Sequence, residues 1–316
     1  MLDRYHHGFA NNLNSTAPVP VLKILESEES PGASAHIAIG LTSFGMDVSF
    51  HTAIGDDIES TSIISTLKSL GVGSETVIRV KGRSTLTKIR FFGSRESLLD
   101  RSQILLQADR GPNTPLENSI SDSLIDSALS NIPDSCALVI SDYDKGVISR
   151  DGAQTLITTA NNQGIPVIVD PKLTGLEKSR GATVVIFEKR GMSLLSRRIG
   201  LDDDEAAKQL LAEYSWQGIL VLGGIHGIHL HQKEHDCIFM PCMAPTADQQ
   251  IGMHDAAATS LAAALGSGLD LYDAALLASA ACDCVLSAST GRDYIDRATL
   301  GLWLDELAWQ MRISDR

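Results

Sequence analysis

The most constraining feature of this sequence is a series of short apolar, β-branched runs separated by segments of helical periodicity. The runs "ALVISD", "IPVIVD", "ATVVIF" and "GILVLGG" lie between such segments. Continuous apolar strands that alternate with helices are typical of a parallel sheet covered on both faces, which indicates an α/β fold. Caps and periodicity predict helices at 32–45, 56–71, 117–131, 150–163, 202–214, 255–266, 270–287 and 296–312.

Two segments interrupt this alternation. "APVPVLKILESEE" near the start and "STLTKIRFFGSRESLLDRSQILLQAD" further on mix polar and apolar residues without a following helix, as antiparallel strands do. We expect their strands, within about 8–30 and 80–110, to form a small discontinuous sheet. Such a sheet can act as a lid over ligand at the carboxyl ends of the parallel strands. The whole chain, 1–316, is expected to be one domain.

Composition excludes several classes of function. The formal net charge is −13, and no basic face offsets it, so we expect no binding to nucleic acid. The five cysteines form no CxxC pair and fit reduced thiols better than disulfides or a metal site. No apolar run is long enough to cross a membrane, and we expect a cytoplasmic protein.

Several motifs together resemble a known family. "MLDRYHHGFANNLNSTAPVPVLKI", "PGASAHIAIGLTSFG", "AIGDD", "TKIR", "ISDYDKG", "VIVDPK" and "GMHD" occur in the order and spacing of the ribokinase-like (PfkB) carbohydrate kinases. Within that family the chain is most similar to the D-glycero-β-D-manno-heptose 7-phosphate kinase domain. The resemblance covers nearly the whole chain. It implies a three-layer α/β/α domain with a β lid, ATP and Mg²⁺ as cofactors, a phosphorylated sugar as substrate, and a homodimer formed through the lid.

The resemblance also assigns the catalytic loop in "QQIGMHDAAATSLAAALGSG". Asp255 would be the general base that accepts the hydroxyl proton of the sugar. Gly252, Met253 and His254 would form the anion pocket with their backbone amides at a helix N-terminus. Family members have small residues in this loop, so the bulk of Met253 and His254 is expected to compromise the pocket. A protonated His254 could instead supply positive charge to a phosphate.

On the sugar side the resemblance implies contacts near the lid. The residues it assigns to substrate binding are Asp3, Gly32, His36, Lys88, Arg90, Asp142 and Lys145. Lys88 and Arg90 share one strand face, where two cations could meet a sugar phosphate. They could equally be solvated charges, and Asp142 could serve only to cap or turn the chain. The family has a glycine pair and then an asparagine where this chain has Gly32, Ala33 and His36, and the β-carbon of Ala33 restricts the backbone.

The nucleotide side departs further from the family pattern. The residues assigned there are Asp170, Lys172, Glu188, Gly224, Gly227 and Ser279. The Asn-x-x-Glu element of the family is absent after "ATVVIF", and an anionic Asp283 stands near the expected adenine pocket. Two hypotheses follow: a sugar kinase that acts on a heptose phosphate or similar sugar, or a catalytically silent protein that binds a sugar phosphate or a partner.

Two further expectations concern the rest of the chain. The histidines of "HGIHLHQKEHDC" could converge on a metal, but a hairpin with a solvated polar face is the simpler interpretation, and we predict no metal site there. Family members also have an apolar strand before the segment that resembles "MLDRY". We expect an unfilled position in the sheet unless another segment occupies it or the chain continues upstream.

Overall fold

The computed structural model describes residues 1–94, 102–112, 114–245, 250–288 and 295–314. Its main sheet has six strands in the order β12-β11-β10-β9-β8-β7. Four are parallel: β7 (Leu138–Ser141), β8 (Val167–Asp170), β9 (Val184–Glu188) and β10 (Gly218–Leu222). The antiparallel hairpin β11 (Ile228–Gln232) and β12 (Ile238–Met240) extends one edge. The parallel sheet is therefore confirmed, with an antiparallel extension.

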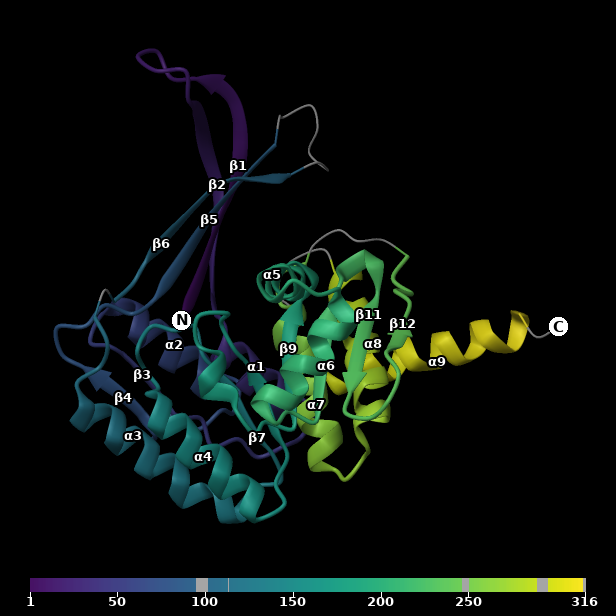
Figure 1. Ribbon diagram of the computed structural model, residues 1–316. Coiled ribbons are helices and arrows are strands. Elements are labelled where there is room, and N and C mark those ends of the chain that lie inside the picture. The colour runs from purple at the N-terminus through teal and green to yellow at the C-terminus, as the bar shows by residue number, and fades with distance from the viewer. Residues whose placement is uncertain (95–101, 113, 246–249, 289–294, 315–316) are drawn as a thin grey trace.

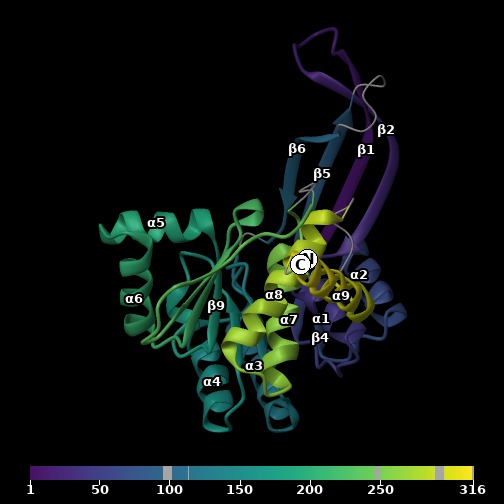
Figure 2. The ribbon, with the colours of Figure 1, turned by 90° about the vertical axis from the view of Figure 1, so that its right-hand side faces the viewer.

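Helices cover both faces of this sheet. On one face lie α3 (Asn118–Asn131), α4 (Arg150–Asn162), α5 (Lys189–Ile199) and α6 (Asp203–Tyr214). On the other lie α1 (Ser34–Ser43), α7 (Met253–Gly266), α8 (Leu271–Ser287) and α9 (Arg297–Ser314). Figure 2 shows α5 and α6 on one side of β9 and α7 and α8 on the other. Alternate residues of each strand enter opposite cores, which is why the strands read as unbroken apolar runs.

The discontinuous second sheet projects away from this body. It has the order β2-β1-β5-β6, built from β1 (Leu2–Leu13), β2 (Pro20–Pro31), β5 (Thr87–Ser94) and β6 (Gln103–Arg110). We call these four strands the lid sheet; Figure 1 shows them rising above the main domain. The three-layer α/β/α domain with a small discontinuous β lid, as expected, is thus present.

A third, two-stranded sheet stands apart from the other two. It contains β3 (Thr52–Gly55) and β4 (Val77–Val80), which are parallel, with α2 (Ile58–Ser69) between them. Among the described strands, none pairs with β3 on its other side, and none pairs with the outer edge of β7. The expected unfilled position in the sheet is therefore present in the described structure.

The sequence-based helices agree with the structure except at one place. All eight expected helices are present, but α5 was not expected, because the charged residues that follow β9 were interpreted as a departure from a motif rather than as a helix start. In the described residues, no helix is long and apolar enough to cross a membrane.

Candidate active site

The base of the lid sheet presents a buried ion pair. Parallel pairing of β1 with β5 places Asp3 opposite Lys88 and Tyr5 opposite Arg90. The Arg90 Nη1 atom lies 2.7 Å from Asp3 Oδ1, and both side chains are 10% exposed. Arg90 is thus held by a carboxylate. Lys88 forms no ion pair with the residues the structure describes, so of the two expected phosphate-binding cations it is the one free to meet an anion.

The turn from β2 into α1 lies against this pair. A β-carbon on Gly32 would come 1.9 Å from Asp3 Oδ2, so only glycine allows the carboxylate to approach so closely. Ala33 adopts φ 54° and ψ −132°, a conformation that favours glycine, as its β-carbon suggested. One turn later His36 is buried, and its Nδ1 atom lies 3.4 Å from Asp255 Oδ2. His36 therefore connects the lid hinge to the expected general base.

The N-terminus of α7 differs from the expectation at Met253. Gly252 caps the helix with φ 94°, which requires glycine. The Met253 side chain is only 5% exposed and packs in the core with α8, so its bulk does not lie over the amides as expected. Helical geometry explains this, because the first residue of α7 faces the sheet while the next two face the cleft. The Met253 amide donates to the Gln250 carbonyl at 3.5 Å, and the amides of the next residues of the first turn are directed outward, as at any helix start.

His254 joins two carboxylates at the ends of neighbouring strands. Its Nδ1 atom lies 3.1 Å from Asp170 Oδ1, and its Nε2 atom lies 3.6 Å from Glu188 Oε1. Burial alone would lower the pKa of His254, but the hydrogen bond with Asp170 and the negative charges of Asp170 and Glu188 raise it to about 10. His254 is therefore an imidazolium at neutral pH and adds a positive charge beside the α7 amides.

Tyr143, which follows β7, lies where the two halves of the site meet. The Nζ atoms of Lys88 and Lys172 lie 5.4 Å and 4.3 Å from its ring centroid. Burial, together with the negative charges of Asp255, Asp170 and Asp3, raises its pKa well above the ordinary value. The expected sugar-side and nucleotide-side residues thus surround one neutral phenol. The sequence showed Tyr143 only as part of the motif "ISDYDKG".

Two of the expected sugar-side residues lie outside this cluster. Asp142 accepts a hydrogen bond from Lys178 Nζ at 2.7 Å and another from the backbone of Asp144, so it stabilises a turn. This is the turn role that the sequence left open for Asp142. Lys145 is exposed, and its carbonyl accepts a hydrogen bond from Arg83. The sequence did not predict a role for Lys178, because its partners Asp142 and Asp144 are more than 30 residues away along the chain.

The expected nucleotide-side glycines form the turn between β10 and β11. Gly224 (φ 60°) and Gly227 (φ 77°) are both left-handed, and a β-carbon on Gly224 would lie 3.2 Å from the Gln250 side chain. The turn therefore packs against the segment that leads into α7. On α8, Ser279 is buried and Asp283 accepts a hydrogen bond from the Met243 amide at 3.2 Å. Burial raises the pKa of Asp283 above the ordinary value of an aspartate.

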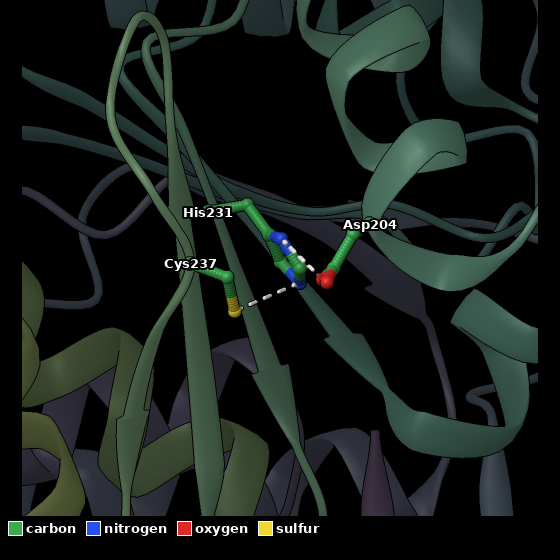
Figure 3. Close-up of side chains that lie close together, drawn as sticks. All are labelled: Asp204, His231 and Cys237. Atoms are coloured by element: carbon green, nitrogen blue, oxygen red, sulfur yellow. Dashed lines mark hydrogen bonds and ion pairs between the residues drawn. The ribbon is translucent and has the colours of Figure 1, made fainter.

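The histidine-rich hairpin contains a separate polar cluster, shown in Figure 3. The expected hairpin is present, but its polar face is not solvated throughout, since His231 is only 6% exposed. Its Nδ1 atom lies 3.6 Å from Asp204 Oδ1, and its Nε2 atom lies 3.9 Å from Cys237 Sγ. Burial raises the pKa of the Cys237 thiol to about 11, which keeps it protonated. These three residues therefore link α6 to the hairpin through one ion-pair contact and one hydrogen bond.

Solved structures of sugar kinases share this fold. Ribokinase from Thermotoga maritima superposes with a TM-score of 0.73 at 19% identity, covering 96% of each chain. Phosphofructokinase-2 from Escherichia coli in complex with fructose-6-phosphate gives 0.74 at 18% identity, covering 97% of this chain and 96% of that one. At such low identity these likenesses show the fold alone.

Curated relatives are more similar in sequence. Bifunctional protein HldE from Shewanella piezotolerans is 30% identical over 302 residues, which cover 95% of this chain and 61% of that protein. The HldE of Halorhodospira halophila is 32% identical over 292 residues, 90% of this chain and 58% of that protein. The chain thus spans about three fifths of the length of these relatives. The sequence pattern of the pfkB family carbohydrate kinases matches residues 17–296, and the chain belongs to that family.

Proposed function

We propose that this protein transfers a phosphoryl group from ATP to a hydroxyl group of a phosphorylated sugar, with Asp255 as the general base. The observation that supports this most directly is the place of Asp255 in the first turn of α7, where His36 Nδ1 lies 3.4 Å from its Oδ2 atom. A carboxylate next to outward-facing helix amides is what phosphoryl transfer to a hydroxyl requires.

Asp255 is the residue to which we assign proton transfer. Its side chain is 16% exposed, which leaves it accessible from the cleft, and His36 lies 3.4 Å away. His36 fixes the orientation of the carboxylate, so that one oxygen can accept the hydroxyl proton. The outward amides of α7 would bind the transferring phosphoryl group, and the imidazolium of His254 would offset part of its negative charge.

The sugar is expected to bind between the lid sheet and Tyr143. Asp3, held in place by Arg90, presents its second carboxylate oxygen to sugar hydroxyl groups, and Lys88 binds the phosphate already on the sugar. The sequence resemblance favours a heptose phosphate as this substrate. Gly32 supports the site by leaving room for Asp3.

The nucleotide side fits the phosphates of ATP better than it fits a divalent cation. ATP would supply the phosphoryl group when bound. Lys172 lies over the ring of Tyr143, and the Gly224–Gly227 turn lies against Gln250, which leads into α7. Asp170 and Glu188 are the carboxylates nearest this region, but both are paired with His254. Mg²⁺ would therefore compete with the imidazolium for these two carboxylates. Ser279 is buried on α8 and would serve the adenine side.

The same pairing favours a second candidate function. If His254 permanently occupies the space between Asp170 and Glu188, the protein would bind a sugar phosphate without transferring a phosphoryl group. The sugar-side residues would then retain their roles, and Asp255 would contribute nothing to binding.

A kinase assay separates the two candidates. Wild type, Asp255→Asn and Asp273→Asn would be incubated with ATP, Mg²⁺ and a panel of sugar phosphates, and ADP release measured. Asp273 is an exposed carboxylate on α8 and serves as the matched control. We expect Asp255→Asn to lower turnover by about 10² to 10⁴-fold while the control stays at the wild-type rate. Turnover that survives Asp255→Asn would contradict the assignment, and binding of sugar phosphate without turnover would support the silent protein.

We also propose that the protein acts as a cytoplasmic homodimer joined through the lid sheet. The lid sheet exposes large apolar side chains on its outer strands, including Val21 and Ile24 on β2 and Ile104 and Leu106 on β6. Such exposed apolar surface is typical of an interface. The test compares the molecular mass of the wild type and of the double variant Ile24→Lys/Leu106→Lys by analytical ultracentrifugation. A dimer formed through these strands should dissociate in the variant.

A further inference from the structure

Three side chains with metal-binding atoms meet beside the histidine-rich hairpin, outside the candidate active site. Asp204 comes from the first turn of α6, His231 from β11, and Cys237 from the segment between β11 and β12. Figure 3 shows the three side chains pointing toward one another. One ligand atom of each residue lies within 4.8 Å of those of the other two. Carboxylate, imidazole and thiolate are the ligands that zinc takes in proteins.

The contacts of His231 leave its buried ring poorly satisfied. The residue is only 6% exposed. Its Nδ1 atom lies 3.6 Å from Asp204 Oδ1, which is longer than an ordinary hydrogen bond of about 2.7–3.2 Å. Its Nε2 atom lies 3.9 Å from Cys237 Sγ, and a thiol is a weak donor. Because buried polar groups in folded proteins are normally well paired, this ring has capacity for a stronger ligand.

The spacing of the ligand atoms fits a zinc ion. Zinc bonds of about 2.3 Å to sulfur and 2.1 Å to nitrogen, at a tetrahedral angle, place the two ligand atoms roughly 3.6 Å apart. The 3.9 Å between Cys237 Sγ and His231 Nε2 is within a few tenths of an ångström of this value. Magnesium and calcium prefer sites made of oxygen atoms, so a nitrogen and a sulfur ligand select against both ions.

We propose that Asp204, His231 and Cys237 bind one Zn²⁺ ion, which links α6 to the hairpin of β11 and β12. Within the described residues the group has three members, and the Asp204 side chain is 66% exposed, so water would take the fourth coordination position. The sequence-based expectation of no metal site here rested on a solvated polar face. The burial of His231 removes that premise.

The charges around the cluster fit a divalent cation. Binding turns the Cys237 thiol into a thiolate, and its proton leaves to the solvent. The thiolate and the carboxylate of the cluster together balance the two positive charges of the ion. Asp203 and Lys208 on α6 face the ring of His231 with opposite charges, and burial lowers the pKa of both His231 and His229, so both rings are neutral at pH 7. One proton should therefore be released for each ion bound.

Zinc titration of the full chain, freed of metal by a chelator and kept reduced, tests the site. Competition with a chromophoric chelator gives the stoichiometry and affinity, and we expect one ion bound and one proton released per chain. Cys237→Ser and Asp204→Asn should each weaken binding by more than about tenfold, since even the loss of a ligand's hydrogen-bond partner costs about 10- to 100-fold. Cys136→Ser and His235→Gln, which change an exposed cysteine and an exposed hairpin histidine, should bind as wild type does.

Cobalt identifies the thiolate directly. Co²⁺ in place of Zn²⁺ should give a thiolate charge-transfer band and the visible bands of tetrahedral coordination in the wild type and in Cys136→Ser, and Cys237→Ser should lose the charge-transfer band. Zn²⁺ should also raise the melting temperature of the wild type more than that of Cys237→Ser. None of these measurements depends on phosphoryl transfer.

Three results would overturn the proposal. The first is no binding with Zn²⁺ in excess. The second is binding that Cys237→Ser leaves unchanged, and the third is binding that His235→Gln abolishes, because either would assign the ion to adventitious chelation by surface histidines. Both informative variants should fold, since serine is close to cysteine in size and Asp204 is exposed.

Discussion

His254 should make the stability of this protein fall as the pH rises above neutrality. Its pKa is about 10 in the folded protein, compared with an ordinary value of 6.5. Because the folded-state pKa is raised, the charged imidazole contributes its full stabilisation below pH 6.5, and that contribution is lost as the pH rises through 10. Replacing His254 with glutamine should remove this dependence.

The magnitude follows from the shift in pKa. Each unit is worth about 1.4 kcal/mol, so between pH 7 and pH 10 the contribution could fall by about 4 kcal/mol. The side chain is 24% exposed, and solvent screening reduces this value. We therefore expect His254→Gln to cost about 2 kcal/mol at pH 7 and close to nothing at pH 10.

Urea unfolding of wild type and His254→Gln at several pH values measures this difference directly. Subtracting the two curves cancels the groups that titrate equally in both proteins. His226 is exposed, and His226→Gln, measured in the same way, is the control. A difference for His254→Gln that does not change with pH, or an imidazole resonance that titrates near pH 6.5, would refute the ion-pair argument.

Three other substitutions test the lid side of the site. Ala33→Gly should raise the free energy of unfolding in urea by about 1 kcal/mol, because glycine adopts the left-handed backbone conformation of this position without strain. A loss of stability would show that the packing of the Ala33 methyl group outweighs the strain in its backbone. Arg90→Met should cost about 3 kcal/mol or more by leaving Asp3 buried and unpaired, and Asp3→Asn/Arg90→Met should recover part of that loss. Lys88→Ala should reduce the thermal shift caused by heptose 7-phosphate; an equal shift in both proteins would remove Lys88 from the phosphate site.

Local patterns were sufficient to predict most of the fold. Helix caps such as Asp57, Ser149 and Asp270 accept hydrogen bonds from the first turn, so the sequence marked where α2, α4 and α8 begin. The helix α5 was missed because it begins at Lys189, directly after the last residue of β9, and the N-cap residue Glu188 makes no side-chain cap. No turn residue or capping side chain in the sequence marks where that strand ends and the helix begins.

The pairings within the candidate site were beyond local patterns. Arg90 and Asp3 are 87 residues apart in the sequence, and His254 and Asp170 are 84 apart, so which charge meets which depends on tertiary structure. Sequence reasoning therefore identified several residue types of the site without their partners. Met253 shows the same limit, since the direction of its side chain depends on how α7 packs against α8.

These pairings determine where an incoming anion can bind. Asp3, Asp142 and Asp170 each have a cationic partner in the described structure, so much of the negative charge of the site is already offset. Lys88 and Lys172 remain without an ion pair among the described residues, and both lie over the ring of Tyr143. Two like charges on one ring repel each other, and an anion between them removes that repulsion. Because Lys88 belongs to the lid sheet and Lys172 to the main domain, a bound phosphate would connect the two parts.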